Sequence, residues 1–114
     1  MSKILLKTGR GTFNIVETEE IVYVERLKAR SRVFLKDKDL RVNISFTDLL
    51  AKLSVDFQQC HRKYLVNLAC VKKFNNRKVL LNNNVSLPLG LQYKDQFTDK
   101  LISQFDNSLN RKSI

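Results

Sequence analysis

The chain has 114 residues, and its 43% hydrophobic content with only three glycines and one proline excludes a disordered chain or a fibrous repeat and supports one folded domain. Lysine and arginine number 21 against 11 aspartate and glutamate residues, which gives a formal net charge of +10 and a pI of about 9.9. A charge of this size is typical of proteins that meet nucleic acid or an anionic membrane surface, so the expected partner is a polyanion.

The first half of the chain predicts short strands. Five segments are rich in β-branched and aromatic residues, and polar or glycine-rich stretches such as 8–11 and 36–39 separate them. Such stretches close hairpins, so antiparallel pairing is expected. The five predicted strands are residues 3–7, 12–16, 21–25, 33–35 and 40–44.

One segment near the middle of the chain has the period of a helix. Its apolar residues fall at i, i+3, i+4 and i+7, beginning at Phe46. Ser45 stands before it as a suitable N-cap, with Asp48 three residues further on. We therefore expect a short amphipathic helix over about residues 46–53.

The second half returns to strand patterns and ends in a helix. Asparagine-rich turns at 75–77 and 82–84 separate several of these strands. From Tyr93 to Phe105 an apolar residue recurs every four positions, which predicts a C-terminal helix over about residues 93–105. Five further strands are predicted at residues 57–60, 65–68, 71–74, 78–81 and 85–87.

Together these elements predict a mainly β fold of about ten short strands in small antiparallel sheets, with one short helix and a C-terminal helix. Residues 1–106 are expected to form one domain and residues 107–114 a polar tail. The N-terminal residues lack a signal-peptide pattern, and no apolar run approaches the roughly 20 residues of a membrane span. The expected location is therefore the cytoplasm.

Nothing in the sequence favours catalysis or a metal centre. His61 is the only histidine, and neither a glycine-rich phosphate loop nor a Ser-His-Asp order is visible. Cys60 and Cys70 form no CxxC pair, so both are expected to be reduced, with Cys60 half-buried and Cys70 in the core. If the Cys60 thiol were exposed, neighbouring cations would lower its pKa. We expect no catalytic residue, no metal, no cofactor and no small-molecule substrate.

The positive charge is concentrated in two segments. Residues 57–94 contain seven lysines and arginines and no acidic residue. Between Arg26 and Arg32 a cation occupies every second position, and on an extended backbone these side chains would point to one side. Unpaired like charges repel, which favours a bound anion. The alternative is a set of solubilising charges on exposed faces.

The stretch QCHRKYLVNL, residues 59–68, places the histidine and two cations before a strand. Because no second ligand or nucleophile accompanies His61, it is interpreted as a structural residue or a phosphate contact. In the strand that follows, either the even-numbered or the odd-numbered residues of 64–68 are expected to turn inward.

Residues 57–68, FQQCHRKYLVNL, resemble the "F-x-R-C-H-R-S-Y-L-V-N" signature of LytTR-type DNA-binding domains. Three flanking segments also match that family in order. Residues 21–25, IVYVE, look like its early "I-x-Y-x-E" strand, and residues 46–49 lie where its short helix lies. Residues 85–88, VSLP, look like its late "I-P" strand. The resemblance covers about residues 3–105. It implies a bacterial transcription regulator that binds double-stranded DNA sequence-specifically. Loops would enter successive major grooves on imperfect direct repeats and bend the duplex.

In members of this family three loops make the contacts, and the matching positions here are 28–32, 61–63 and 90–94. Gln59-Cys60 stands where the family commonly has an arginine before the histidine, so one cation is missing. Gly90-Leu91 replaces the family's "S-R", which removes a residue suited to reading guanine. The predicted DNA-binding residues are Lys28, Arg30, Ser31, Arg32, His61, Arg62, Lys63, Leu91, Gln92 and Lys94.

The resemblance also implies protein partners. These are a second copy on an adjacent half-site, and either a phosphorylatable receiver domain or a membrane-bound inhibitor partner, depending on whether the regulator is two-domain or free-standing. A basic β-rich RNA-binding module is the alternative function. Against it, the aromatic residues Tyr23, Phe34, Tyr64 and Phe74 alternate like core residues and are not expected to cluster for base stacking.

Overall fold

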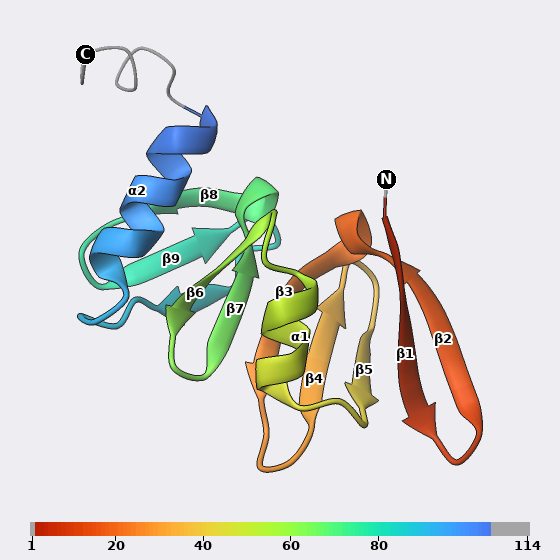
Figure 1. Ribbon diagram of the computed structural model, residues 1–114. Helices are drawn as coiled ribbons and strands as arrows, with labels where there is room; N and C mark the ends of the chain where they lie inside the picture. The colour runs from red at the N-terminus through yellow and green to blue at the C-terminus, as the bar shows by residue number, and fades with distance from the viewer. Residues whose placement is uncertain (1, 106–114) are drawn as a thin grey trace.

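The computed structural model describes residues 2–105, and over that range it contains ten strands and two α-helices (Figure 1). The predicted mainly β class is confirmed, and each predicted strand is present with bounds shifted by at most two residues. The tail predicted at 107–114 lies outside the described residues. The strands are β1 (Lys3–Gly9), β2 (Thr12–Glu17), β3 (Ile21–Arg26), β4 (Ser31–Leu35), β5 (Asp39–Val42), β6 (Phe57–His61), β7 (Tyr64–Asn67), β8 (Val71–Phe74), β9 (Lys78–Leu81) and β10 (Ser86–Pro88). The helices are α1 (Phe46–Lys52) and α2 (Lys94–Phe105), and the 3-10 turns are η1 (Thr18–Glu20) and η2 (Leu68–Cys70).

The strands form three antiparallel sheets that lie side by side (Figure 1). The β1–β2 hairpin is at one end, a five-stranded sheet in the order β5-β4-β3-β7-β6 occupies the middle, and the sheet β10-β9-β8 with α2 is at the other end. The molecule is elongated, with principal extents of 51 × 28 × 24 Å. This row of short sheets brings hairpin turns from different sheets to one long edge.

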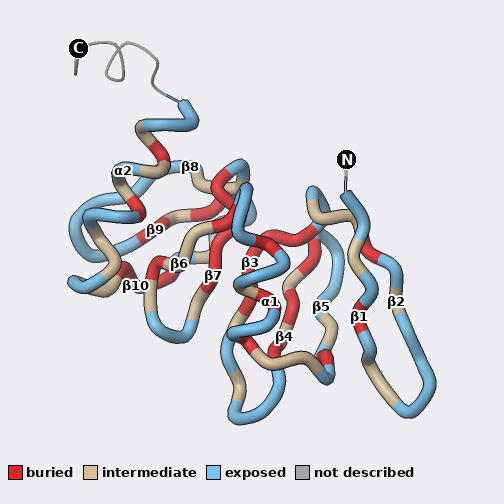
Figure 2. The backbone as a smooth tube through the Cα atoms, viewed as in Figure 1, coloured by how far each residue is buried: buried red, intermediate tan, exposed pale blue. Residues whose placement is uncertain are grey.

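Two hydrophobic cores lie between the sheets, and the central strands β3 and β7 contribute to both (Figure 2). Successive residues of a strand point to opposite faces. In β7, Leu65 therefore packs into the core that contains α1, whereas Val66 packs into the core that contains α2. The two alternatives left open for residues 64–68 are both correct, because this strand has a core on each side.

Both helices follow their predicted patterns with small differences. The Ser45 hydroxyl accepts a hydrogen bond from the Asp48 backbone N–H at 3.1 Å, which caps α1, and the helix ends one residue before the predicted position. In α2, Phe97 and Leu101 are buried, but Phe105 is 62% exposed. The apolar stripe therefore stops one turn earlier than the sequence predicted.

Candidate nucleic-acid interface

Three connections lie along one long edge of the molecule (Figure 1). The Arg26 backbone N–H donates to the carbonyl oxygen of Lys63 at 2.8 Å, and the Gly90 N–H donates to the carbonyl oxygen of Cys60 at 2.8 Å. These bonds join each connection to the next, so the structure brings together the three segments that the sequence predicted as one site. The connections are the β3–β4 turn at residues 27–30, the β6–β7 turn at residues 62–63, and the segment 89–93 between β10 and α2.

The β3–β4 turn presents two cations. The Leu27 N–H donates to the carbonyl oxygen of Arg30 at 3.0 Å, which closes the turn, and Lys28 and Arg30 are exposed on it. The prediction that alternate cations of this segment line one side of an extended strand is wrong, because the chain reverses direction here.

Ser31 and Arg32 lie in β4, behind the turn, and both side chains are already engaged. Ser31 is 0% exposed, and its hydroxyl donates to the carbonyl oxygen of Ile44 at 2.8 Å, so its predicted role in binding DNA is corrected to a structural one. Arg32 donates from Nε to the Asp39 carboxylate at 2.8 Å, and its guanidinium carbon lies 4.9 Å from the ring centroid of Phe34. This hydrogen bond holds the pKa of Asp39 below its usual value, so the carboxylate stays charged and holds Arg32 on the sheet.

The β6–β7 turn is fixed by hydrogen bonds to its backbone. The Arg62 carbonyl oxygen accepts from Arg26 Nε at 3.0 Å and from Gln59 Nε2 at 3.3 Å. The Lys63 N–H donates to Nδ1 of His61 at 3.1 Å. Because Nδ1 acts as an acceptor, a neutral imidazole carries its hydrogen on Nε2. His61 therefore offers an N–H donor, while Arg62 and Lys63 are exposed.

Arg26 holds this turn in place, a role that the sequence did not reveal. Besides its two hydrogen bonds to the β6–β7 turn, its guanidinium carbon lies 4.5 Å from the ring centroid of Phe46 in α1. The sequence placed Arg26 in a cationic cluster but not in the site. No local pattern could identify it, because its hydrogen-bond partner Arg62 is 36 positions away along the chain.

The third connection packs against the second through a glycine. A Cβ atom at Gly90 would lie 3.2 Å from Cδ2 of Tyr93 and 3.6 Å from Cδ2 of His61. Beyond it, Leu91 is 86% exposed and Gln92 is exposed, while Lys94 begins α2 and is half-buried. The small residue allows the connection to approach His61 and leaves an apolar side chain in solvent.

Aromatic rings form a row across the middle sheet, and three of the four aromatic residues that were predicted to lie in the core belong to it. Phe34 stacks on Tyr23 with centroids 4.2 Å apart, Tyr23 meets Tyr64 edge-on at 6.1 Å, and Tyr64 lies 5.8 Å from the His61 ring. Tyr23 is buried, while Phe34 and Tyr64 are half-buried. The rings pack mainly against one another.

The cysteines differ from their predicted surroundings. Cys60 is 0% exposed rather than half-buried, and burial raises the pKa of its thiol to about 12, so the neighbouring cations do not activate it. Cys70 is half-buried rather than in the core. Within residues 2–105, no group of three or more His, Cys, Asp or Glu side chains could hold a metal ion, and no helix is long and apolar enough to cross a membrane.

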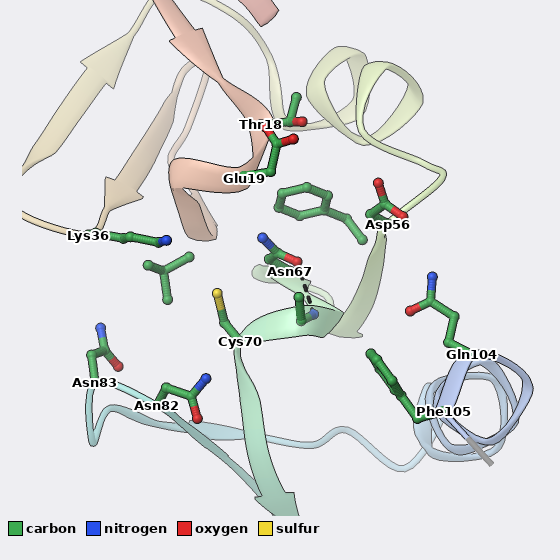
Figure 3. Close-up of a pocket in the computed structure, with 13 residues that line it drawn as sticks. Thr18, Glu19, Lys36, Asp56, Asn67, Cys70, Asn82, Asn83, Gln104 and Phe105 are labelled. Carbon is green, nitrogen blue, oxygen red and sulfur yellow. Dashed lines mark hydrogen bonds between the residues drawn. The ribbon is translucent and has the colours of Figure 1, made fainter. Parts of the chain in front are cut away.

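A hollow of about 890 Å³ lies away from the three connections (Figure 3). It is found where β3 begins and β7 ends, whereas the β3–β4 and β6–β7 turns are at the other ends of these strands. Lys36, Glu19 and Asp56 bring charges of both signs to it, and Cys70 and Phe105 also line it. Mixed charge does not suit a polyanion, so the three connections remain the candidate site.

Comparison with known proteins points to DNA binding. A family model described as the LytTr DNA-binding domain matches residues 11–102. The chain is similar to a solved LytTr DNA-binding domain from Bacillus cereus, which is described as part of a methyl-accepting/DNA response regulator. The two share 21% sequence identity and superpose with a TM-score of 0.72. The match covers 90% of this chain and 97% of that one. None of the curated proteins matches the chain. The structural likeness, at this low identity, concerns the fold.

Proposed function

Because the chain belongs to the LytTR family of DNA-binding domains, we propose that it inserts its three connections into successive major grooves of double-stranded DNA as part of a bacterial transcription regulator. One observation carries this proposal. The three segments with the matching family positions lie on one edge and are joined by the Arg26–Lys63 and Gly90–Cys60 backbone hydrogen bonds. An edge held in this way meets DNA with little loss of conformational entropy.

Each side chain has a role that follows from its chemistry. The exposed cations Lys28, Arg30, Arg62 and Lys63 suit phosphate oxygens, and an arginine that reaches a base edge suits guanine O6 and N7. The Nε2–H of His61 suits an acceptor on a phosphate or on a purine base.

The remaining predicted contacts come from the third connection and from β4. Leu91 suits a thymine methyl group, Gln92 suits adenine, and Lys94 suits a phosphate. Arg32 joins the site only if it leaves Asp39.

Two copies are proposed to bind imperfect direct repeats. Copies that face the same side of the duplex must be separated by whole helical turns, each of roughly 36 Å. The molecule is 51 Å long, so a copy whose long edge lies on the DNA covers more than one helical turn. Two copies on the same side of the duplex must then be two turns apart, which places the half-site centres about 21 base pairs apart. Inserting about five base pairs, half a turn, should abolish paired binding.

The proposed function also implies further protein partners and a location in the cell. A receiver domain on the same polypeptide or a membrane-bound inhibitor would control access to DNA, and the protein would act in the cytoplasm. Restored DNA binding on phosphorylation of a longer chain, or loss of binding on addition of membranes, would tell the two control mechanisms apart.

The aromatic row favours the rival function, RNA binding, more than the sequence alone did. However, stacking of Phe34 on Tyr23 occupies the ring faces that bases would need, and Tyr23 is buried. The test is selection from random pools of duplex DNA and of RNA, followed by sequencing of the retained molecules. We expect a duplex motif to be enriched; enrichment in the RNA pool alone would overturn the proposal. If about six cations meet phosphates, log affinity should fall with log salt at a slope of roughly −5.

A further inference from the structure

The sheet β10-β9-β8 carries cations that the three connections do not use. Lys73, Arg77 and Lys78 are exposed. None of them forms an ion pair within residues 2–105, where the single salt bridge joins Arg32 to Asp39. Resting on the proposed function, we infer that the outer face of this sheet binds the phosphates of duplex DNA that continues past the three connections.

The strand register places two of these lysines on one face. Lys73 of β8 is opposite Leu80 of β9, and Leu80 is opposite Ser86 of β10. Lys78 is two residues before Leu80 and therefore shares its face. The intervening residue, Val79, is fully buried in the core on the other side. Lys73 and Lys78 thus stand on the face that points away from the protein.

This face is hollowed between the two lysines. A hollow of about 330 Å³ is lined by Lys73, Lys78, Asn75, Ser86, Leu80 and Phe74. Two ammonium groups, an amide and a hydroxyl provide hydrogen-bond donors to anionic oxygens. No carboxylate lines it, and none occurs in residues 57–94. These donors suit a phosphate, and their spread over a sheet face suits a chain of phosphates.

A turn closed by hydrogen bonds carries Arg77 and leads into Lys78, the first residue of β9. The Asn75 Oδ1 accepts hydrogen bonds from the N–H groups of Arg77 at 2.8 Å and Lys78 at 2.9 Å. The Asn75 N–H donates to the carbonyl oxygen of Lys78 at 3.0 Å. The backbone that carries the charges is therefore ordered before any ligand binds.

The same turn adjoins the third DNA-contacting connection. The Leu89 N–H donates to the carbonyl oxygen of Arg77 at 2.8 Å, and Leu89 is followed by Gly90. The basic face consequently begins beside the first residue of the third connection, at the end of the molecule that carries α2 (Figure 1). A duplex that leaves this edge and bends toward the protein meets Arg77 first and then Lys78 and Lys73. The outer face stabilises the bend.

The experiment compares two duplexes that each contain a single half-site of the motif selected from the random pool, so that one copy of the protein binds each duplex. One is trimmed to about 12 base pairs, slightly more than one helical turn, and the other extends to about 30 base pairs with flanking DNA beyond the third connection. The test variant is Lys73→Ala/Lys78→Ala. The matched control, Lys36→Ala/Lys38→Ala, removes the same charge from the exposed β4–β5 turn, at the opposite edge from the three connections. Thermal unfolding confirms that both variants fold.

The test variant should bind the long duplex about 10- to 50-fold more weakly than wild type, with a salt slope shallower by about two units. On the short duplex it should match wild type. Fluorescence energy transfer between the ends of the long duplex should report a smaller bend. The control should match wild type on both. An equal loss on both duplexes, or no loss on either, overturns this inference alone. Failure of wild type to bind either duplex overturns the proposed function as well.

Discussion

Arg26 and Arg62 are joined by a hydrogen bond from the Nε of the first to the backbone carbonyl oxygen of the second, at 3.0 Å, so one cation orients the turn that exposes another. Like charges at these two positions would repel if the side chains met. The contact instead pairs a guanidinium with a carbonyl dipole, and the Arg62 side chain is left exposed. Arg26 therefore positions the β6–β7 turn, the second of the three connections proposed to meet DNA.

Arg26→Lys keeps the charge but removes the planar guanidinium that bonds to the turn and lies over Phe46. The lost hydrogen bond lowers the free energy of unfolding by about 0.5–1.5 kcal/mol. We expect DNA affinity to fall about three- to tenfold with an unchanged salt slope, because no phosphate contact is removed. Titration at several salt concentrations gives both quantities. A shallower slope would show that Arg26 itself contacts a phosphate.

Asp39→Asn should strengthen DNA binding. The carboxylate of Asp39 holds Arg32 on the sheet, and the substitution removes both the ion pair and a negative charge. We expect affinity to rise about two- to fivefold and the salt slope to steepen by about one unit, as Arg32 becomes free to reach a phosphate. Asp37→Asn, in the neighbouring β4–β5 turn, makes the same charge change without releasing an arginine and is the matched control. If both variants behave alike, Arg32 plays no part in the interface.

Gly90→Ala should disturb the junction between the second and third connections. The added methyl group lies 3.2 Å from Tyr93 Cδ2 and 3.6 Å from His61 Cδ2, so a ring must shift. Overpacking of this kind costs about 1 kcal/mol or somewhat more. We expect a lower melting temperature and weaker DNA binding.

Gly9→Ala is the control for that substitution. The nearest atoms to a Cβ at Gly9 are 3.9 Å away, and no strained backbone conformation is required. It should leave DNA affinity unchanged and raise stability by up to about 1 kcal/mol, since alanine restricts the unfolded chain. Equal effects of the two substitutions would show that the contact with His61 has no role in positioning.

Arg62→Ala and Leu65→Ala should separate binding from folding within one short segment. Arg62 is exposed on the turn, so its removal should weaken DNA binding about tenfold without changing the melting temperature. Leu65 is 1% exposed in the core with α1, so its truncation should lower the free energy of unfolding by about 2–5 kcal/mol. Calorimetry and DNA titration of both variants check this. Unfolding of Arg62→Ala would reverse the assignment.

The sequence predicted the strands and helices well because their signals are local. The period of apolar residues marks α1, and asparagine-rich turns mark the ends of β8 and β9. The individual site residues were harder to predict, because their states depend on distant partners. The buried Ser31 hydroxyl donates a hydrogen bond to the carbonyl oxygen of Ile44, and the Arg32 side chain is bound to the Asp39 carboxylate. The placing of Lys73 and Lys78 on one outer face of the β10-β9-β8 sheet depends on strand register, which the sequence alone does not determine.

Leu91→Arg should give the third connection a preference for guanine. Leu91 is 86% exposed beside Gly90, where leucine can make only an apolar contact, for example with a thymine methyl group. An arginine there could donate two hydrogen bonds to guanine O6 and N7, which would favour guanine over other bases by about 1–3 kcal/mol.

We expect the Leu91→Arg variant to show a new guanine preference at one position in each half-site. If the arginine instead meets a phosphate, the salt slope should steepen by about one unit without a new preference. Base-by-base selection profiles of wild type and variant at matched salt distinguish these results. Identical profiles and slopes from a folded variant would place Leu91 outside the groove and leave Gln92 or Lys94 as the contact from this connection.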